Sequence, residues 1–324
     1  MAQAMGYKPN LAARYLKSQK QLRIAVHLPV EIAFFFDAVR QGIADAAAPF
    51  EPALRIDFAA YPRLGEGDVA LFKQALSDGA SGMIICPGTP ATVKQLIRKA
   101  SRRNIPVVCV ATDAPGTERI AAVSACPSTS GAVAGELLCR MVRSPGSFGL
   151  VTGNLETGDH ADKVEGFRSV VNALDPKREI AAIIETHDDP ETAYSRTNAL
   201  LRDRSDLCGV YVGTANSLPV LRAIEESGRG NRIAVITTDL FPALIPLIRS
   251  GRILATIDQR PQTQGRLALQ ALYQFLMDGT CPTPTIKVAP HIVMMSNLDL
   301  LAERLSAESE QGPEVGPRRR YGGA

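Results

Sequence analysis

The sequence lacks several features that would assign it to a known compartment or chemistry. Its six cysteines include no Cys-x-x-Cys pair, and its four histidines are scattered without the spacing of metal ligands. No apolar run approaches the length of about 18 residues that a membrane span needs, and no N-terminal apolar segment looks like an export signal. The sequence therefore predicts a cytoplasmic protein with reduced, buried cysteines, no membrane span and no metal site.

Catalytic signatures are missing as well. The sequence has no P-loop, no Gly-x-Ser-x-Gly elbow and no His-Glu-x-x-His motif. A Gly-x-Gly-x-x-Ala match begins at Gly65, but it follows the second predicted strand instead of the first, and Glu66 and Asp68 within it would repel a pyrophosphate. His187-Asp188-Asp189 is better explained as an exposed helix cap than as a metal site. We therefore expect no enzymatic activity and no cofactor.

Acidic residues are absent from the start of the chain, where Glu31 is the first carboxylate. The same stretch holds five basic residues, which are Lys8, Arg14, Lys17, Lys20 and Arg23. The whole chain of 324 residues carries a net charge of only +3, so its surface as a whole cannot be a nucleic-acid binder. The asymmetry favours a local nucleic-acid contact joined to a sensor over an enzyme.

From Leu22 on, short apolar runs alternate with amphipathic segments. The expected strands are Leu22–Leu28, Ala53–Ala59, Gly82–Cys86, Pro106–Val110, Arg119–Val123, Ser147–Val151, Glu179–Ile184, Gly209–Val212, Arg232–Thr237 and Ile253–Ile257. The expected helices are Phe36–Ala47, Gly67–Ser77, Pro90–Arg102, Ser128–Met141, Ala161–Ala173, Pro190–Leu201, Asn216–Glu226 and Pro261–Met277. Continuous apolar strands separated by helices indicate parallel sheets covered on both faces.

Ten strands exceed one comfortable sheet, so we predict an α/β protein with two doubly wound parallel-sheet lobes. A turn at Asp113–Glu118 interrupts the alternation between them. We expect residues 22–123 plus about 253–283 in lobe 1, and residues 124–252 plus about 284–305 in lobe 2. Residues 1–21 would form a remnant of a DNA-binding domain and a short hinge helix, and residues 306–324 a disordered tail.

Residues 5–18 read Met-Gly-Tyr-Lys-Pro-Asn-Leu-Ala-Ala-Arg-Tyr-Leu-Lys-Ser. They resemble the junction in LacI/GalR-family transcription factors, where the last helix of a helix-turn-helix domain runs into a hinge helix and then a periplasmic-binding-protein-like sensor core. The resemblance extends over essentially the whole chain. It implies that Leu16 wedges into the minor groove, that Lys17 meets phosphates, and that the other DNA contacts come from Tyr7, Asn10 and Ala13. The alternative is a solvated N-terminal helix without DNA contacts.

The chain departs from that family at its start. In the family roughly forty more residues precede this motif and carry the helices that read the major groove. As written, the chain begins at Met1, inside what would be the third helix. An incomplete helix-turn-helix would leave only weak, salt-sensitive DNA binding.

The core resembles ribose-type sugar-binding proteins, in which polar and aromatic residues after the strands bind the ligand. The resemblance implies that Phe35 and Phe36 stack on a sugar ring and that polar groups bind its hydroxyls. The polar set is Asp113, His160, Asn216, Asp239 and Gln259. Alternatives remain at several of them: the phenylalanines can pack in the core, Asp113 can form a turn and His160 can cap a helix.

Two further departures concern ligand identity. Ala111-Thr112 stands where ribose binders carry Asp-Arg, and Cys126-Pro127 stands where relatives often carry Asp-Asn at the crossing between lobes. Taken together, the resemblance implies a ligand-responsive transcriptional regulator of the repressor type, acting as a homodimer on an operator. A sugar or polyol between the lobes would control the hinge helix allosterically. The alternatives are a solute-binding protein for sugar transport and, less favoured, a doubly wound enzyme.

Overall fold

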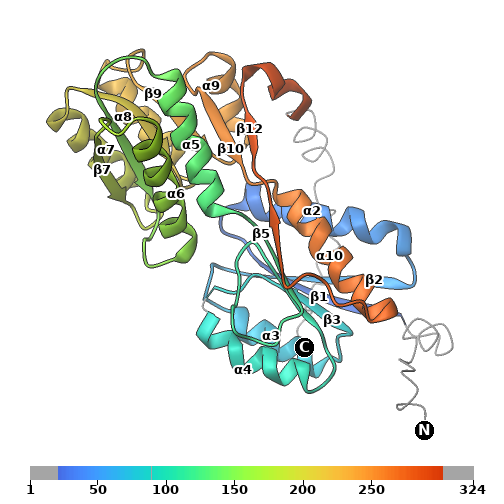
Figure 1. Ribbon diagram of the computed structural model, residues 1–324. Coiled ribbons are helices and arrows are strands. Elements are labelled where there is room, and N and C mark those ends of the chain that lie inside the picture. Colours follow the sequence, from blue (N-terminus) through green and yellow to red (C-terminus); the bar gives the residue numbers. More distant parts are fainter. Residues whose placement is uncertain (1–20, 89, 302–324) are drawn as a thin grey trace, which may run out of the picture.

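The computed structural model describes residues 21–88 and 90–301, which form two α/β lobes (Figure 1). Each lobe contains one six-stranded sheet with helices on both faces. The predicted class of two doubly wound lobes is therefore confirmed. The hinge motif with Tyr7, Asn10, Ala13, Leu16 and Lys17, and the tail 306–324, lie outside the described residues, so these predictions stay predictions.

Lobe 1 is built on a parallel sheet in the order β11-β5-β4-β3-β1-β2. Its strands are β1 (Leu22–Pro29), β2 (Leu54–Tyr61), β3 (Gly82–Ile85), β4 (Val107–Val110), β5 (Ala121–Ala125) and β11 (Thr285–Val288). Its helices are α2 (Ala33–Ala47), the short η2 (Ala48–Phe50), α3 (Asp68–Ser77), α4 (Pro90–Ser101) and α10 (Pro261–Asp278). Helices α2 and α10 bury one apolar cluster against the sheet, and α3 and α4 bury another.

Lobe 2 is built on a sheet in the order β12-β10-β9-β8-β6-β7, in which β12 alone pairs antiparallel. Its strands are β6 (Ser147–Thr152), β7 (Ile180–Glu185), β8 (Leu207–Val212), β9 (Ala234–Thr238), β10 (Ala255–Asp258) and β12 (His291–Val293). Its helices are α5 (Pro127–Met141), α6 (Gly158–Leu174), α7 (Pro190–Asp203), α8 (Ser217–Glu226), η3 (Pro242–Leu244), α9 (Ile245–Arg249) and η4 (Met295–Asn297). No helix in the described part of the chain is long and apolar enough to cross a membrane.

Within the described residues the chain crosses between the lobes three times, after β5, after β10 and after β11. The structure places two segments on the other side of the predicted lobe boundaries. Strand β10 extends the sheet of lobe 2 beside β9, and β11 extends the sheet of lobe 1 beside β5. The sequence predicts residues of about 253–283 in lobe 1 and of about 284–305 in lobe 2, and these two strands differ from that prediction. Each strand instead continues a parallel edge, where its backbone groups find partners.

Helices α2 and α10 of lobe 1 cross at contact distance, and glycine makes this possible. A Cβ on Gly42 would lie 2.0 Å from the carbonyl oxygen of Gln262, and a Cβ on Gly265 would lie 2.1 Å from that of Val39. Both of these oxygens belong to the backbone, so the contact cannot be relieved by the movement of a side chain. The crossing holds the first turn of α10 against α2, beside the segment at which the chain leaves lobe 2.

Lobe 2 repeats this arrangement with helices α5 and α6. A Cβ on Gly131 would lie 1.9 Å from the carbonyl oxygen of Lys163, and a Cβ on Gly166 would lie 2.0 Å from that of Ser128. In each lobe the crossing joins the helix after the first strand to the helix by which the chain enters from the other lobe. The two lobes are therefore related by more than sheet topology.

Candidate functional site

Left-handed backbone marks the carboxyl ends of the strands in both lobes. Seven non-glycine residues have positive φ in the described ranges, and six of them lie in segments that follow a strand: Ile32, Ala111, His187, Asp188, Asp239 and Arg260. Such conformations cost on the order of 1–3 kcal/mol each and gather at binding sites. Open α/β sheets bind ligands at the carboxyl ends of their strands, so the strain points to the same edges as the topology.

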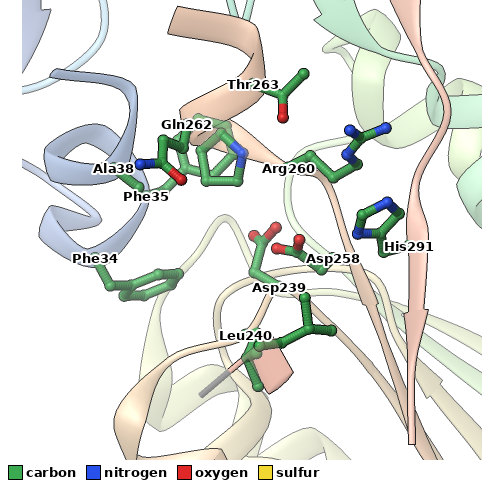
Figure 2. Close-up of a pocket in the computed structure, with 12 residues that line it drawn as sticks. Phe34, Phe35, Ala38, Asp239, Leu240, Asp258, Arg260, Gln262, Thr263 and His291 are labelled. Atoms are coloured by element: carbon green, nitrogen blue, oxygen red, sulfur yellow. The ribbon is translucent and has the colours of Figure 1, made fainter. Parts of the chain in front are cut away.

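A pocket of about 90 Å³ lies between the lobes and has space for several water-sized groups (Figure 2). Its lining combines α2 of lobe 1, the segment after β9 in lobe 2 and the two crossings that join them. The lining residues are Phe34, Phe35, Ala38, Asp239, Leu240, Asp258, Arg260, Pro261, Gln262, Thr263, His291 and Leu301. Aromatic rings and charged groups thus meet in one inter-lobe space.

Asp239 and Gln259, predicted from the ends of two neighbouring strands, form one unit. The Nε2 amide of Gln259 donates to both carboxylate oxygens of Asp239, at 2.9 and 3.1 Å. Burial raises the pKa of Asp239 to about 6, and the Gln259 hydrogen bond and the charge of Lys163 oppose that rise. Asp239 is only 6% exposed, so its carboxylate faces the protein and the pocket instead of bulk water.

Lys163 is a buried cation behind this unit. Its Nζ atom pairs with the carboxylate of Asp159 at 2.5 Å. Burial lowers the pKa of Lys163, but the charge of Asp159 outweighs that effect and the net pKa lies above the usual value. The cation therefore stays charged and stabilises negative charge in this half of lobe 2.

The three consecutive phenylalanines are divided between the core of lobe 1 and the pocket. Phe36 is 3% exposed and packs in the core of lobe 1. It does not line the pocket, in contrast to the prediction that it stacks on the ligand. In helix α2 it shares the core face with Val39 and Ile43, at helical spacing. Phe35 lines the pocket and meets Phe36 edge-on at 5.1 Å. Phe34, which was not predicted, also lines the pocket.

Asp113 does not line the pocket either. Its carboxylate is engaged by the guanidinium of Arg119, with a 2.7 Å contact to one oxygen, and it accepts the amide of Ala114 at 2.6 Å. Arg119 also donates to the carbonyl of Pro284 at 2.6 Å, just before β11. The structure thus gives Asp113 the turn-forming role that the sequence left open, with an ion pair added.

His160 and Asn216 lie in a separate polar row along the ends of β6, β7 and β8. Gly153 donates its amide to Nδ1 of His160 at 3.3 Å, and Nε2 faces the carboxylate of Asp188 at 3.9 Å. Burial lowers the pKa of His160. Asn216 is buried and donates to the hydroxyl of Thr186 at 3.4 Å. Both residues belong to the edge that was predicted, but not to the pocket lining.

Sequence reasoning missed the pocket residues at the crossings. Arg260 lies two residues after the end of β10, next to the predicted Gln259, and position alone could have indicated it. His291 lies in β12, a three-residue strand without an apolar run. In the described part of the chain, no group of three or more His, Cys, Asp or Glu side chains is placed to hold a metal ion.

Comparison with known proteins gives a consistent family. A model of the periplasmic binding protein domain matches residues 24–280. A D-ribose/D-allose-binding protein of Pseudomonas aeruginosa is 22% identical over 231 residues, which cover 67% of this chain and 72% of that protein. A xylose/arabinose-binding protein of Sulfolobus acidocaldarius is 26% identical over 254 residues, which cover 72% of this chain and 62% of that protein. Catabolite control protein A of Priestia megaterium is 23% identical over 292 residues, which cover 89% and 84%.

Solved structures share the fold at low identity. The periplasmic ribose ABC transporter structure from Conexibacter woesei superposes with a TM-score of 0.79 at 18% identity, over 87% of this chain and 95% of that one. A solute-binding protein from Burkholderia graminis in complex with D-arabinose gives a TM-score of 0.77 at 21% identity, over 86% and 97%. The chain belongs to the periplasmic binding protein domain family.

Proposed function

We propose that this chain binds a monosaccharide or polyol in the pocket between its two lobes and does not turn it over. The observation that carries the proposal is Asp239, which lines an inter-lobe pocket together with Phe34 and Phe35 of α2 and is held in place by the amide of Gln259. A carboxylate accepts hydrogen bonds from two neighbouring sugar hydroxyls, and an aromatic face suits the C–H face of the ring. Phe35, Asp239 and Gln259 are the proposed contacts, and Phe34 is added to them.

The names of the relatives support a small sugar as the ligand. They are binding proteins for ribose and allose and for xylose and arabinose, and one related structure contains D-arabinose. Pentoses are therefore the first ligands to test. We propose that His160 and Asn216 contact the ligand from the lobe 2 edge when the lobes draw together, whereas Asp113 stays in its ion pair.

The wider role that the relatives favour is that of a solute-binding protein for sugar transport. The second candidate is a ligand-responsive repressor of the LacI/GalR type, located in the cytoplasm and bound to DNA as a homodimer. It is supported by the basic motif of residues 5–18 and by the similarity to catabolite control protein A along most of both chains. Sugar binding at the same pocket is common to both roles.

A thermal-shift screen of the purified chain tests the sugar proposal. The panel comprises pentoses, hexoses and polyols, and binding to the folded state raises the melting temperature by mass action. We expect at least one sugar to stabilise the chain, Asp239→Ala to abolish that shift, and the exposed Asp203→Ala to retain it. No shift with any sugar, or an equal shift in both variants, contradicts the proposal.

Sedimentation velocity and DNA binding separate the two wider roles. A repressor is expected to sediment as a dimer at micromolar concentration, and the sugar is expected to change its affinity for duplex DNA, measured by fluorescence anisotropy. A solute-binding protein is expected to be a monomer that binds the sugar and no DNA. A stable monomer with intact residues 5–18 therefore counts against the repressor.

A further inference from the structure

We infer that the sugar bound by this chain carries an anionic group, which Arg260 binds at the crossing between β10 and α10. The inference rests on the proposed sugar binding and refines its ligand class. It follows from the placement of one guanidinium, from the helix end beside it and from the way the nearby carboxylates are already engaged.

Arg260 is a pocket arginine without an ion-pair partner in the described part of the chain. Several other partly buried arginines pair with carboxylates, as Arg119 does with Asp113, Arg178 with Asp175, Arg204 with Glu179 and Arg252 with Glu225. The partly buried Arg229 donates instead to backbone carbonyls, among them those of Leu201 and Leu207. Arg260 also adopts left-handed backbone, with φ 57° and ψ 55°. Non-glycine residues in this conformation are strained and cluster at ligand-binding sites.

The amino end of α10 adds hydrogen-bond donors next to Arg260. Pro261 is the first residue of this 18-residue helix, and the first amide that bonds a carbonyl of the same turn is that of Gln264, to Arg260. The amides of Gln262 and Thr263 come before it, and both residues line the pocket, as does the hydroxyl-bearing side chain of Thr263. Such a helix end favours an anion by its free amides and its dipole.

The two pocket carboxylates do not cancel this preference. Asp239 is held by Gln259 and faces the charge of Lys163. Asp258 stands opposite His291 in the β10–β12 ladder. Figure 2 shows Arg260 and His291 at one end of the pocket and Phe34 at the other. A sugar can therefore present its anionic group to the Arg260 end and its hydroxyls to Asp239.

A guanidinium binds both carboxylate and phosphate in a bidentate geometry, so a uronic acid and a sugar phosphate both satisfy the site. Isothermal titration compares each anionic sugar with its neutral parent at physiological salt. The pairs are D-galacturonate with D-galactose, D-glucuronate with D-glucose, and D-ribose 5-phosphate with D-ribose. We expect at least one anionic sugar to bind about tenfold or more tightly than its parent, and the pair that shows it identifies carboxylate or phosphate.

Arg260→Gln is expected to remove that advantage, so that the anionic sugar binds no more tightly than its neutral parent. The control is Arg266→Gln, because Arg266 is exposed on the same helix. Neutral sugars that bind as tightly as the anionic ones, or an advantage that survives in Arg260→Gln, overturn the inference and leave sugar binding intact. Binding of no member of any pair overturns the inference, and the thermal-shift screen with its wider panel then decides separately on sugar binding.

Discussion

The ring of Phe34, at the start of α2 in lobe 1, stacks on the ring of Phe241, after β9 in lobe 2. Their centroids lie 4.5 Å apart and their planes are inclined by 27°. Phe241 is buried in the lobe 2 core, and Phe34 packs against the cores of both lobes. Because Phe34 also lines the pocket, one aromatic pair connects the placement of the lobes to the proposed binding site.

Replacing either ring is expected to destabilise the packing of the two lobes against each other. A double-mutant cycle with Phe34→Ala and Phe241→Ala is expected to give a coupling of about 0.5–1.5 kcal/mol in the free energy of unfolding by urea, since stacked aromatic pairs contribute that much beyond burial. Phe34→Ala is also expected to weaken sugar binding. Phe50→Ala is the matched control, because Phe50 stacks on Tyr273 within lobe 1. Additive effects of the first two substitutions contradict the account.

Asp239→Asn is expected to stabilise the free protein at neutral pH while weakening sugar binding. The pKa of Asp239 is raised from 3.8 to about 6, so its stabilising contribution is present below pH 4 and is lost as the pH rises to 6. Removing the charge is then expected to raise the free energy of unfolding at pH 7 by up to about 3 kcal/mol, at about 1.4 kcal/mol per pKa unit. The melting temperatures of variant and wild type, compared from pH 4 to pH 7, are expected to diverge with rising pH. A constant difference contradicts the prediction.

His27 is expected to make the free energy of unfolding fall on acidification, in about the pH range where Asp239 makes it rise. It is buried beside Asp68, its Nδ1 atom has no hydrogen-bond partner among the described residues, and burial lowers its pKa from 6.5 to about 4. Its contribution is present above pH 6.5 and is lost as the pH falls to 4, by up to about 3 kcal/mol. His27→Gln is therefore expected to flatten the loss of melting temperature on acidification. The exposed His187→Gln is the control, and an unchanged slope in His27→Gln is the contradicting result.

Gly42→Ala is expected to destabilise lobe 1 by about 1–3 kcal/mol or more, as overpacking does when backbone cannot yield. Its added methyl group would meet the Gln262 carbonyl and push α10 away from α2. Phe34 lies in α2 and Arg260 directly precedes α10, so a shift between the two helices would move both residues. Sugar binding is therefore expected to weaken as well. Thermal unfolding and titration measure both effects. Gly158→Ala, where a Cβ meets no atom within 4 Å, is expected to change neither.

The sequence could predict the parts of the fold that local pattern determines. Each of the ten predicted strands overlaps an observed strand, because buried strands are continuous apolar runs. Strands β11 and β12 were missed because they are three or four residues long and half exposed. The position of each strand depends on which sheet edge is unpaired after the chain has crossed between the lobes. The local sequence pattern contains no information about that edge.

The site divides in the same way. Asp239 and Gln259 end neighbouring parallel strands, so topology alone brings them together, as predicted. Phe35 and Phe36 are consecutive residues of α2, so their side chains point in different directions around the helix. Phe35 lines the pocket and Phe36 does not. Asp113 meets a partner six residues later, and only the geometry of that turn makes the ion pair. Site residues at the ends of neighbouring strands could be predicted from the topology. Residues whose side-chain direction depends on the geometry of a helix or a turn could not.

The central claim is that a sugar binds between the lobes at the Asp239 end of the pocket. A crystal structure of the chain with the sugar that stabilises it most tests this claim directly. The account predicts electron density for the ring against Phe35, with hydroxyls hydrogen-bonded to Asp239 and Gln259. A sugar bound elsewhere on either lobe, with this pocket filled only by solvent, would contradict it.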